Sequence, residues 1–85
     1  MRRAPVAHSW DDPRIAEWTG RIARFKAEGA SPSAASLAVR RLTADVGTCG
    51  LQAVCSRLRV PVPYQMLRVG PLMDALAGWL KEPSP

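Results

Sequence analysis

The sequence predicts an all-α protein, a compact bundle of four to five short helices, and three observations support this prediction. Apolar residues recur at three- and four-residue spacings, the period of an α-helix. Most of these segments are bounded by serine, aspartate, proline or glycine, which start or stop helices. No segment alternates polar and apolar residues with a period of two, so no sheet is expected.

The chain has 85 residues, which is enough for one domain around one small hydrophobic core. We expect that helical domain over residues 10–82. A flexible N-terminal tail is expected at 1–9 and a C-terminal tail at 83–85.

The first helix is expected to begin after Asp12, a good N-cap residue, and to end at Gly29, which can take a left-handed conformation. Its core stripe follows helical spacing and consists of Ile15, Trp18, Ile22 and Phe25. A second face holds only small residues, namely Ala16, Gly20, Ala23 and Ala27. Glycine lowers helix propensity by about 1 kcal/mol relative to alanine. We therefore interpret the small face as a site of close helix contact, including a homodimer contact.

Four further helices follow the same pattern of starts and stops. The second is expected over 32–46, after Ser31 and before Gly47, and the third from 48 to about 60, where two prolines prevent continuation. A short helix is expected over about 63–69, and a last one over 71–81.

The three tryptophans are assigned to the core or its edge. Trp18 and Trp79 are expected to anchor the core, because this chain has few other aromatic residues. Trp10 is expected to be the most exposed of the three.

The net charge of +5 is concentrated in one part of the chain. Five arginines between Arg40 and Arg68 are opposed by a single acid, Asp45, whereas residues 1–30 carry six bases and four acids. A basic segment favours an acidic partner. Codon usage in a GC-rich genome would also produce the excess of arginine. On the first helix, the pairs Glu17 with Arg21 and Arg24 with Glu28 are interpreted as solvated surface.

Residues that could perform chemistry are few. Cys49 and Cys55 are six positions apart, so on one helix they point about 120° away from each other and should remain reduced. His8 is the only histidine, which argues against a zinc site, and no nucleophile is placed beside it. We expect no enzyme activity, catalytic residue, metal or cofactor. Without a long apolar run, a cytoplasmic protein with no membrane partner is expected.

Two stretches resemble helix-turn-helix DNA-binding proteins, and they cannot both be the recognition unit. The first is AEGASPSAASLAVRRL at 27–42. It places Gly, small and apolar residues where that family often has them: Gly29, Ala30, Ser31, Ala34, Ala35, Val39 and Leu42. Its AEGAS segment is also similar to the turn in helical regions of some DNA recombinases.

The second stretch is LQAVCSRLRVPVPYQMLR at 51–68. Its first-helix and turn positions would be Leu51, Val54, Cys55, Leu58 and Val60. The resemblance implies that the following helix presents Tyr64, Gln65 and Arg68 to DNA.

Both stretches depart from the family pattern. One face of the helix at 32–46 is apolar, with Ala35, Ala38, Val39, Leu42 and Val46. The opposite face has Leu37 and Ala44 near its centre, where a base-reading helix needs polar groups, with Arg40 and Arg41 as flanks. In the second stretch, Arg59 stands where glycine usually forms the turn.

Two functions are therefore expected. The first is a small DNA-binding regulator of helix-turn-helix type, from a phage or other mobile element. Phosphates would be bound by Arg57, Arg59 and Arg68, base edges by Tyr64 and Gln65, and the contact would be bordered by Arg40 and Arg41. The alternative is a protein-binding modulator, an inhibitor or assembly factor of a larger protein or nucleoprotein complex. It would use Leu37 and Ala44 within a rim of Arg40 and Arg41.

Overall fold

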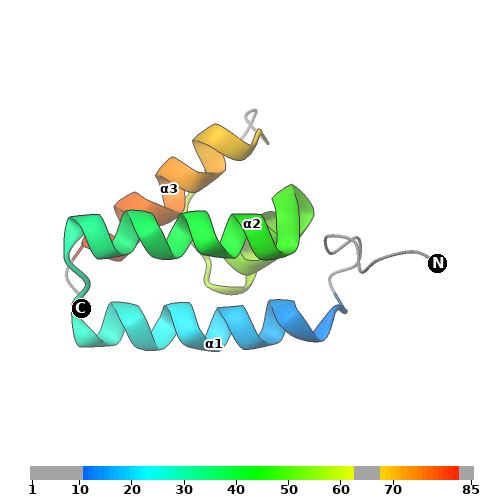
Figure 1. Ribbon diagram of the computed structural model, residues 1–85, viewed down its shortest axis with the longest axis horizontal. Coiled ribbons are helices and arrows are strands. Elements are labelled where there is room, and N and C mark those ends of the chain that lie inside the picture. Colours follow the sequence, from blue (N-terminus) through cyan, green and yellow to red (C-terminus); the bar gives the residue numbers. More distant parts are fainter. Residues whose placement is uncertain (1–10, 63–67, 83–85) are drawn as a thin grey trace.

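The computed structural model describes residues 11–62 and 68–82 and contains three helices there, with no strand among these residues. They are α1 (Pro13–Glu28), α2 (Pro32–Arg57) and α3 (Val69–Lys81). α1 runs antiparallel to the first part of α2, and α3 packs against α2 (Figure 1). The predicted all-α class is confirmed. The described residues contain three helices, however, rather than four to five.

Glycine at position 47 explains most of this difference. Gly47 has φ 75° and ψ −175°, so α2 consists of two helical arms, 32–46 and 48–57, that meet at a kink. Glycine reaches this region of φ and ψ without the steric cost that other residues meet. The predicted break is therefore present, but the two arms form one bent element without a loop. A Cβ atom at Gly50 would collide with the side chain of Val46, so the kink also needs a second glycine.

The predicted starts of α1 and α2 are confirmed by their caps. The carboxylate of Asp12 accepts a hydrogen bond from the backbone N–H of Arg14 at 2.9 Å, and the Ser31 hydroxyl accepts one from Ala34 at 3.2 Å. Gly29 ends α1 with φ 83°. The last helix begins at Val69 rather than at residue 71. The short helix expected at about 63–69 lies mostly outside the described residues.

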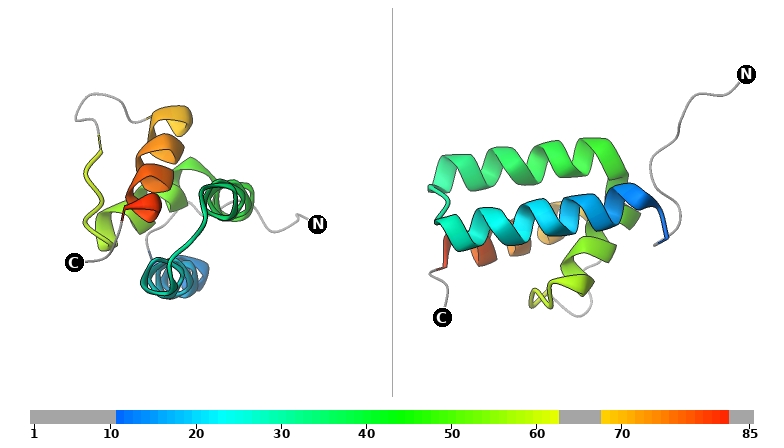
Figure 2. Two further views of the ribbon diagram at one scale, coloured as in Figure 1. Left: turned by 90° about the vertical axis from the view of Figure 1, so that its left-hand side faces the viewer. Right: turned by 90° about the horizontal axis from the view of Figure 1, so that it is seen from below.

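The core lies where the three helices meet. α1 contributes Ile15, Trp18 and Ile22, and α3 contributes Leu72, Leu76 and Leu80. α2 contacts both other helices far more than they contact each other, so it occupies the centre of the fold. Viewed end-on, α3 and the second arm of α2 lie on the same side of the hairpin formed by α1 and the first arm (Figure 2).

The structure agrees with the predicted burial of the tryptophans and with unbridged cysteines, for those of these residues that it describes. Trp18 is buried, and Trp79 is partly buried against the core, whereas Trp10 lies outside the described residues. Cys49 and Cys55 are both free. None of the helices in the described ranges is long and apolar enough to cross a membrane.

Candidate functional site

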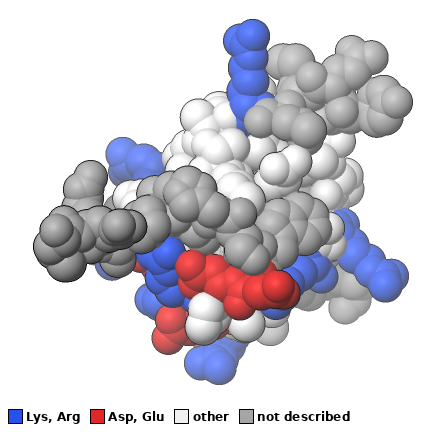
Figure 3. All heavy atoms as spheres, turned by 90° about the vertical axis from the view of Figure 1, so that its right-hand side faces the viewer, with Lys and Arg blue, Asp and Glu red and all other residues white. Residues whose placement is uncertain are grey.

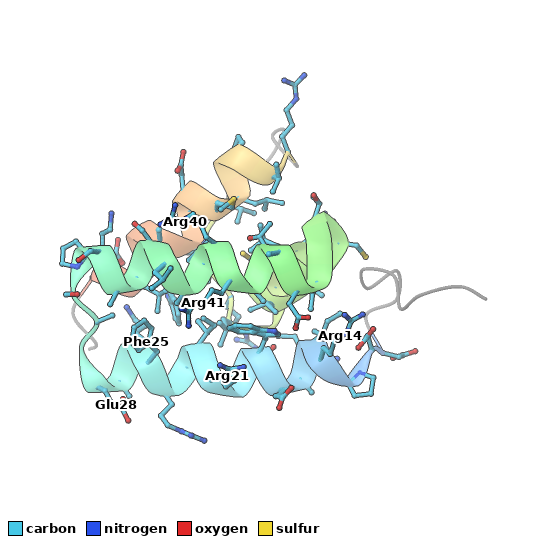
Figure 4. The ribbon with its side chains drawn as sticks, viewed as in Figure 1. Arg14, Arg21, Phe25, Glu28, Arg40 and Arg41 are labelled. Atoms are coloured by element: carbon cyan, nitrogen blue, oxygen red, sulfur yellow. The ribbon has the colours of Figure 1, made fainter. Side chains whose placement is uncertain are left out.

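An open groove of about 390 Å³ lies between α1 and the first arm of α2. Its apolar surface is formed by Trp18, Ile22, Phe25, Ala34, Leu37 and Ala38. Four charged residues complete the lining: Arg21, Arg24, Glu28 and Arg41. Figure 4 shows Phe25 and Arg41 extending into the space between the two helices.

The groove exists because small residues of α2 face larger residues of α1. Ala34 and Ala38 are one helical turn apart, and each side chain ends at its Cβ atom. On the opposite wall, Trp18, Ile22 and Phe25 follow one stripe of α1. Two alanines cannot fill the space that these larger side chains hold open, so the hairpin stays hollow along this line.

Polar contacts near both ends of α1 hold this helix against the rest of the fold. At the start of α1, the Arg14 guanidinium donates to the Asp45 carbonyl at 3.0 Å, and the Trp18 indole donates to the Asp45 carboxylate at 2.7 Å. Near the end of α1, Lys26 Nζ donates to the carbonyl oxygens of Trp79 at 2.5 Å and Glu82 at 2.8 Å. Polar contacts therefore hold α1 against α2 and α3 independently of the apolar core.

The rim of the groove is positively charged. The Arg21 guanidinium lies 4.2 Å from the centre of the Trp18 ring, a cation–π contact. The i, i+4 pairs expected for Arg21 and Arg24 do not form. Elsewhere, Arg14 forms ion pairs with Asp12 at 2.9 Å and with Asp45 at 3.6 Å. Three arginines thus line the groove with a single carboxylate, that of Glu28.

The acids gather at the other end of α1. Figure 3 shows acidic side chains grouped on the face where α1 begins. Asp12 and Asp45 lie at this end, because both contact Arg14 in the first turn of α1. Side-chain hydrogen bonds from Arg14 hold the pKa of Asp12 below its usual range. The hairpin is therefore electrostatically polar, with an acidic start and a basic groove.

The structure divides the surface patch expected on α2. Leu37, which is 43% exposed, and Arg41 both line the groove. Arg40 and Ala44 are exposed as well, but neither lines it. Each residue turns the helix by about 100°, so Arg40 lies on the side of α2 nearer α3 and Arg41 on the side nearer α1 (Figure 4).

The residues expected to bind DNA are only partly described. Arg57, Arg59 and Arg68 are exposed, and Tyr64 and Gln65 lie outside the described residues. Arg59 has φ 58°, a left-handed conformation at the position where helix-turn-helix proteins usually place glycine. The first stretch, 27–42, forms an antiparallel hairpin (Figure 1), not the steeply crossed helices of a helix-turn-helix.

Sequence reasoning missed most of the α1 wall of this groove. Trp18 and Phe25 were assigned to the core, and Arg21 and Arg24 to solvated surface. The available signal was the pairing of alanines 34 and 38 on α2 with an aromatic stripe on α1, but it becomes visible only once the register of the hairpin is known.

No cluster of three or more histidine, cysteine, aspartate or glutamate side chains that could hold a metal ion occurs within residues 11–62 and 68–82. No model of a known protein family matches the chain, and neither a curated protein nor a solved structure matches it. Its function is therefore inferred from its own residues.

Proposed function

We propose that this chain is a non-enzymatic binding protein that modulates or assembles with a larger protein, and that it binds this partner through the groove between α1 and α2. One observation carries the proposal: an apolar hollow with exposed Leu37 at its edge is bordered by three arginines. Protein interfaces commonly combine a dry apolar centre with a polar rim, and aromatic residues and arginine are enriched in them.

The residues of the groove should contribute to the free energy of binding in different ways. Phe25 is partly exposed and offers aromatic surface at a fixed position, with the edge of the buried Trp18 beside it, which costs little conformational entropy on binding. Leu37 offers an apolar side chain that is 43% exposed, and burial of this remaining part by a partner is favourable by about 1 kcal/mol. The arginines would steer an acidic surface toward the groove and set its orientation.

A photo-crosslinking amino acid placed at Leu37 tests the proposal in cells that produce the chain. We expect a covalent adduct with one protein, identified by mass spectrometry. The same amino acid at exposed Asp74 of α3 is the matched control and should give no such adduct. Ala38→Leu, which fills the groove, should abolish the adduct at position 37. An adduct with nucleic acid, or none at all, would contradict the proposal.

A DNA-binding regulator remains the second candidate because of the turn at Arg59. Arg57 and Arg59 are exposed at the junction that follows α2, where Arg59 has a left-handed conformation, and Arg68 is exposed at the start of α3. This supports use of the second stretch, 51–68, on DNA.

Binding to random-sequence and selected duplexes at two salt concentrations tests this candidate. Each arginine that contacts a phosphate should lower the salt slope by about one when it is replaced by glutamine. Gln65→Ala should weaken binding only to preferred sequences, and Leu37→Asp should leave DNA binding unchanged. Absence of salt-dependent binding by the unaltered chain would exclude this candidate.

A further inference from the structure

We infer that the occupant of the groove is an acidic amphipathic helix from the partner protein. This inference rests on the proposed protein-binding function and adds the chemistry and shape of the bound segment. Two features of the groove support this inference, its length and its distribution of charge. A third observation is that the segments outside the described ranges contain no acidic residue.

The length of the groove suits a short helix. Its wall on α1 runs from Trp18 to Glu28 and its wall on α2 from Ala34 to Arg41, so the shorter wall measures about 10 Å, or roughly two helical turns. A helix that lies along such a line inserts apolar residues at positions i, i+3 or i+4, and i+7. Trp18, Ile22 and Phe25 have the same spacing along α1, where Trp18 and Ile22 form the buried floor of the groove and Phe25 is partly exposed.

The charges on the rim of the groove determine which side chains should flank the apolar residues of the bound helix. Arg21, Arg24 and Arg41 lie beside the apolar surface, and none forms an ion pair within the described part of the chain. A partner with carboxylates on both sides of its apolar stripe would pair with them. At the end near Glu28, a further carboxylate would be repelled, so the partner residue there should be neutral or basic.

The apolar surface favours a protein over a nucleic acid as the occupant. Phosphates could pair with the arginines, but a nucleic-acid backbone would gain nothing from the hollow between Phe25 and Leu37. An amphipathic helix uses both parts of the site, because its apolar face displaces water while its acidic flanks meet the rim.

The three segments outside the described ranges carry no acidic side chain. Residues 1–10 contain two arginines and no acid, and neither 63–67 nor 83–85 contains an acid. By charge, none of these segments complements an arginine-rimmed groove. This charge mismatch favours a segment of another molecule as the occupant.

A helical peptide library displayed on phage tests the inference directly. The library is selected on the full chain alone. Enriched peptides are then measured on Ala38→Leu and on Ala44→Leu, a matched control that adds the same atoms outside the groove. We expect enriched peptides with apolar residues at i, i+4 and i+7 and with flanking Asp or Glu. Their affinity should be unchanged by Ala44→Leu and should fall at least tenfold with Ala38→Leu.

The contribution of charge is measured separately on one enriched peptide. Arg24→Gln and Arg41→Gln should each weaken binding by roughly two- to fivefold, and added salt should reduce the difference from the unaltered chain. If Ala38→Leu lacks the parent's circular dichroism, Leu37→Asp serves in its place, because that side chain is exposed and its replacement leaves the core intact.

Three results would overturn the inference, and each differs from failure of the proposed function. Groove-dependent peptides without acidic flanks would refute the acidic helix but leave protein binding standing. Peptides that bind Ala38→Leu as well as the unaltered chain would show that the groove is not their site. A dimer detected by light scattering and lost with Ala38→Leu would identify a second copy as the occupant. The crosslink at position 37 tests the proposed function independently of all three.

Discussion

The indole N–H of Trp18 in α1 donates a hydrogen bond of 2.7 Å to the carboxylate of Asp45 in α2. Trp18 is only 8% exposed, so the bond fixes the orientation of a ring that belongs to the core. The Arg21 guanidinium lies over the same ring. One side chain thus joins the packing of the hairpin to the basic rim of the groove.

Two substitutions of Trp18 should separate the contribution of its packing from that of its hydrogen bond. Trp18→Phe keeps most of the apolar volume and should reduce the free energy of unfolding by about 1–2 kcal/mol. Trp18→Ala also removes the ring and should cost about 3–5 kcal/mol, much of the stability of a domain this small. Urea denaturation followed by circular dichroism measures both changes.

A double-mutant cycle with Asp45→Ala isolates the hydrogen bond from the contacts that Asp45 makes with Arg14. Trp18→Phe should cost less in the Asp45→Ala background than in the parent. Equal costs in both backgrounds would show that the bond contributes nothing, and parental stability of Trp18→Ala would contradict the assignment of Trp18 to the core.

The helix starts and the core stripes could be predicted because they depend on local chemistry. Asp12 and Ser31 cap their helices through their own side chains, and Ile15, Trp18 and Ile22 share a face whatever they pack against. The break at Gly47 was predictable for the same reason. The sequence did not predict that the two arms form one continuous element, because this depends on the packing of Gly50 against Val46.

The groove could not be predicted, because it depends on which residues of two helices face each other. Sequence reasoning grouped Arg40 with Arg41, yet Arg41 lines the groove and Arg40 does not. It also treated Arg24 as half of an ion pair that does not form. Both differences come from the orientation of α2 against α1, which is set by packing across the hairpin rather than by local spacing.

The two cysteines should differ sharply in reactivity. Burial raises the pKa of the Cys55 thiol to about 11, whereas Cys49 is only partly buried. In denaturant without reductant, mass spectrometry should show two alkylated thiols, because the two cysteines are not bridged. In the folded protein at pH 8, Cys55 should react far more slowly than in denaturant, since little thiolate is present. Cys49→Ala identifies the slow thiol, and fast labelling of Cys55 would contradict its burial.

The same thiol should make stability depend on alkaline pH. The pKa of Cys55 is raised from an ordinary value of 9.0 to about 11, so the folded state favours the protonated form. Its contribution to stability is complete below pH 9 and is lost as pH rises toward 11. Between pH 8 and pH 10, urea denaturation should show a larger loss of stability in the parent than in Cys55→Ala. Equal losses would mean that Cys55 has an ordinary pKa.

Lys26 should stabilise the docking of α3 against α1. Its ammonium group binds the carbonyl oxygens of Trp79 and Glu82 at the end of α3 and lies 4.4 Å from the centre of the Trp79 ring. Lys26→Met keeps an aliphatic side chain there but removes the donor and the charge, and should lower the free energy of unfolding by about 1 kcal/mol. Thermal denaturation measures the change. Lys81→Met, on an exposed side chain of α3, is the matched control and should have little effect.

Two glycine-to-alanine substitutions should have opposite effects on stability. Gly47 has φ 75° at the kink of α2, where alanine is strained, so Gly47→Ala should destabilise the protein by about 1–3 kcal/mol. Gly20 lies within α1, and a Cβ atom there would have no neighbour within 4 Å. Gly20→Ala should therefore stabilise α1 by up to about 1 kcal/mol. Thermal denaturation of the two variants measures the contrast.

The same Gly20 variant tests the small face of α1 as a contact between two copies. Gly20, Ala16, Ala23 and Ala27 are exposed in the described structure, and a helix that packed closely against them would collide with an added methyl group. If two copies pair through this face, Gly20→Ala should weaken the dimer in light scattering and lower its melting temperature at high protein concentration. If the face is simply solvated, as its surroundings within the described residues indicate, the substitution should raise the melting temperature equally at every concentration. We expect the second result, because no described helix approaches Gly20 and its only measurable effect is then the gain in helix propensity.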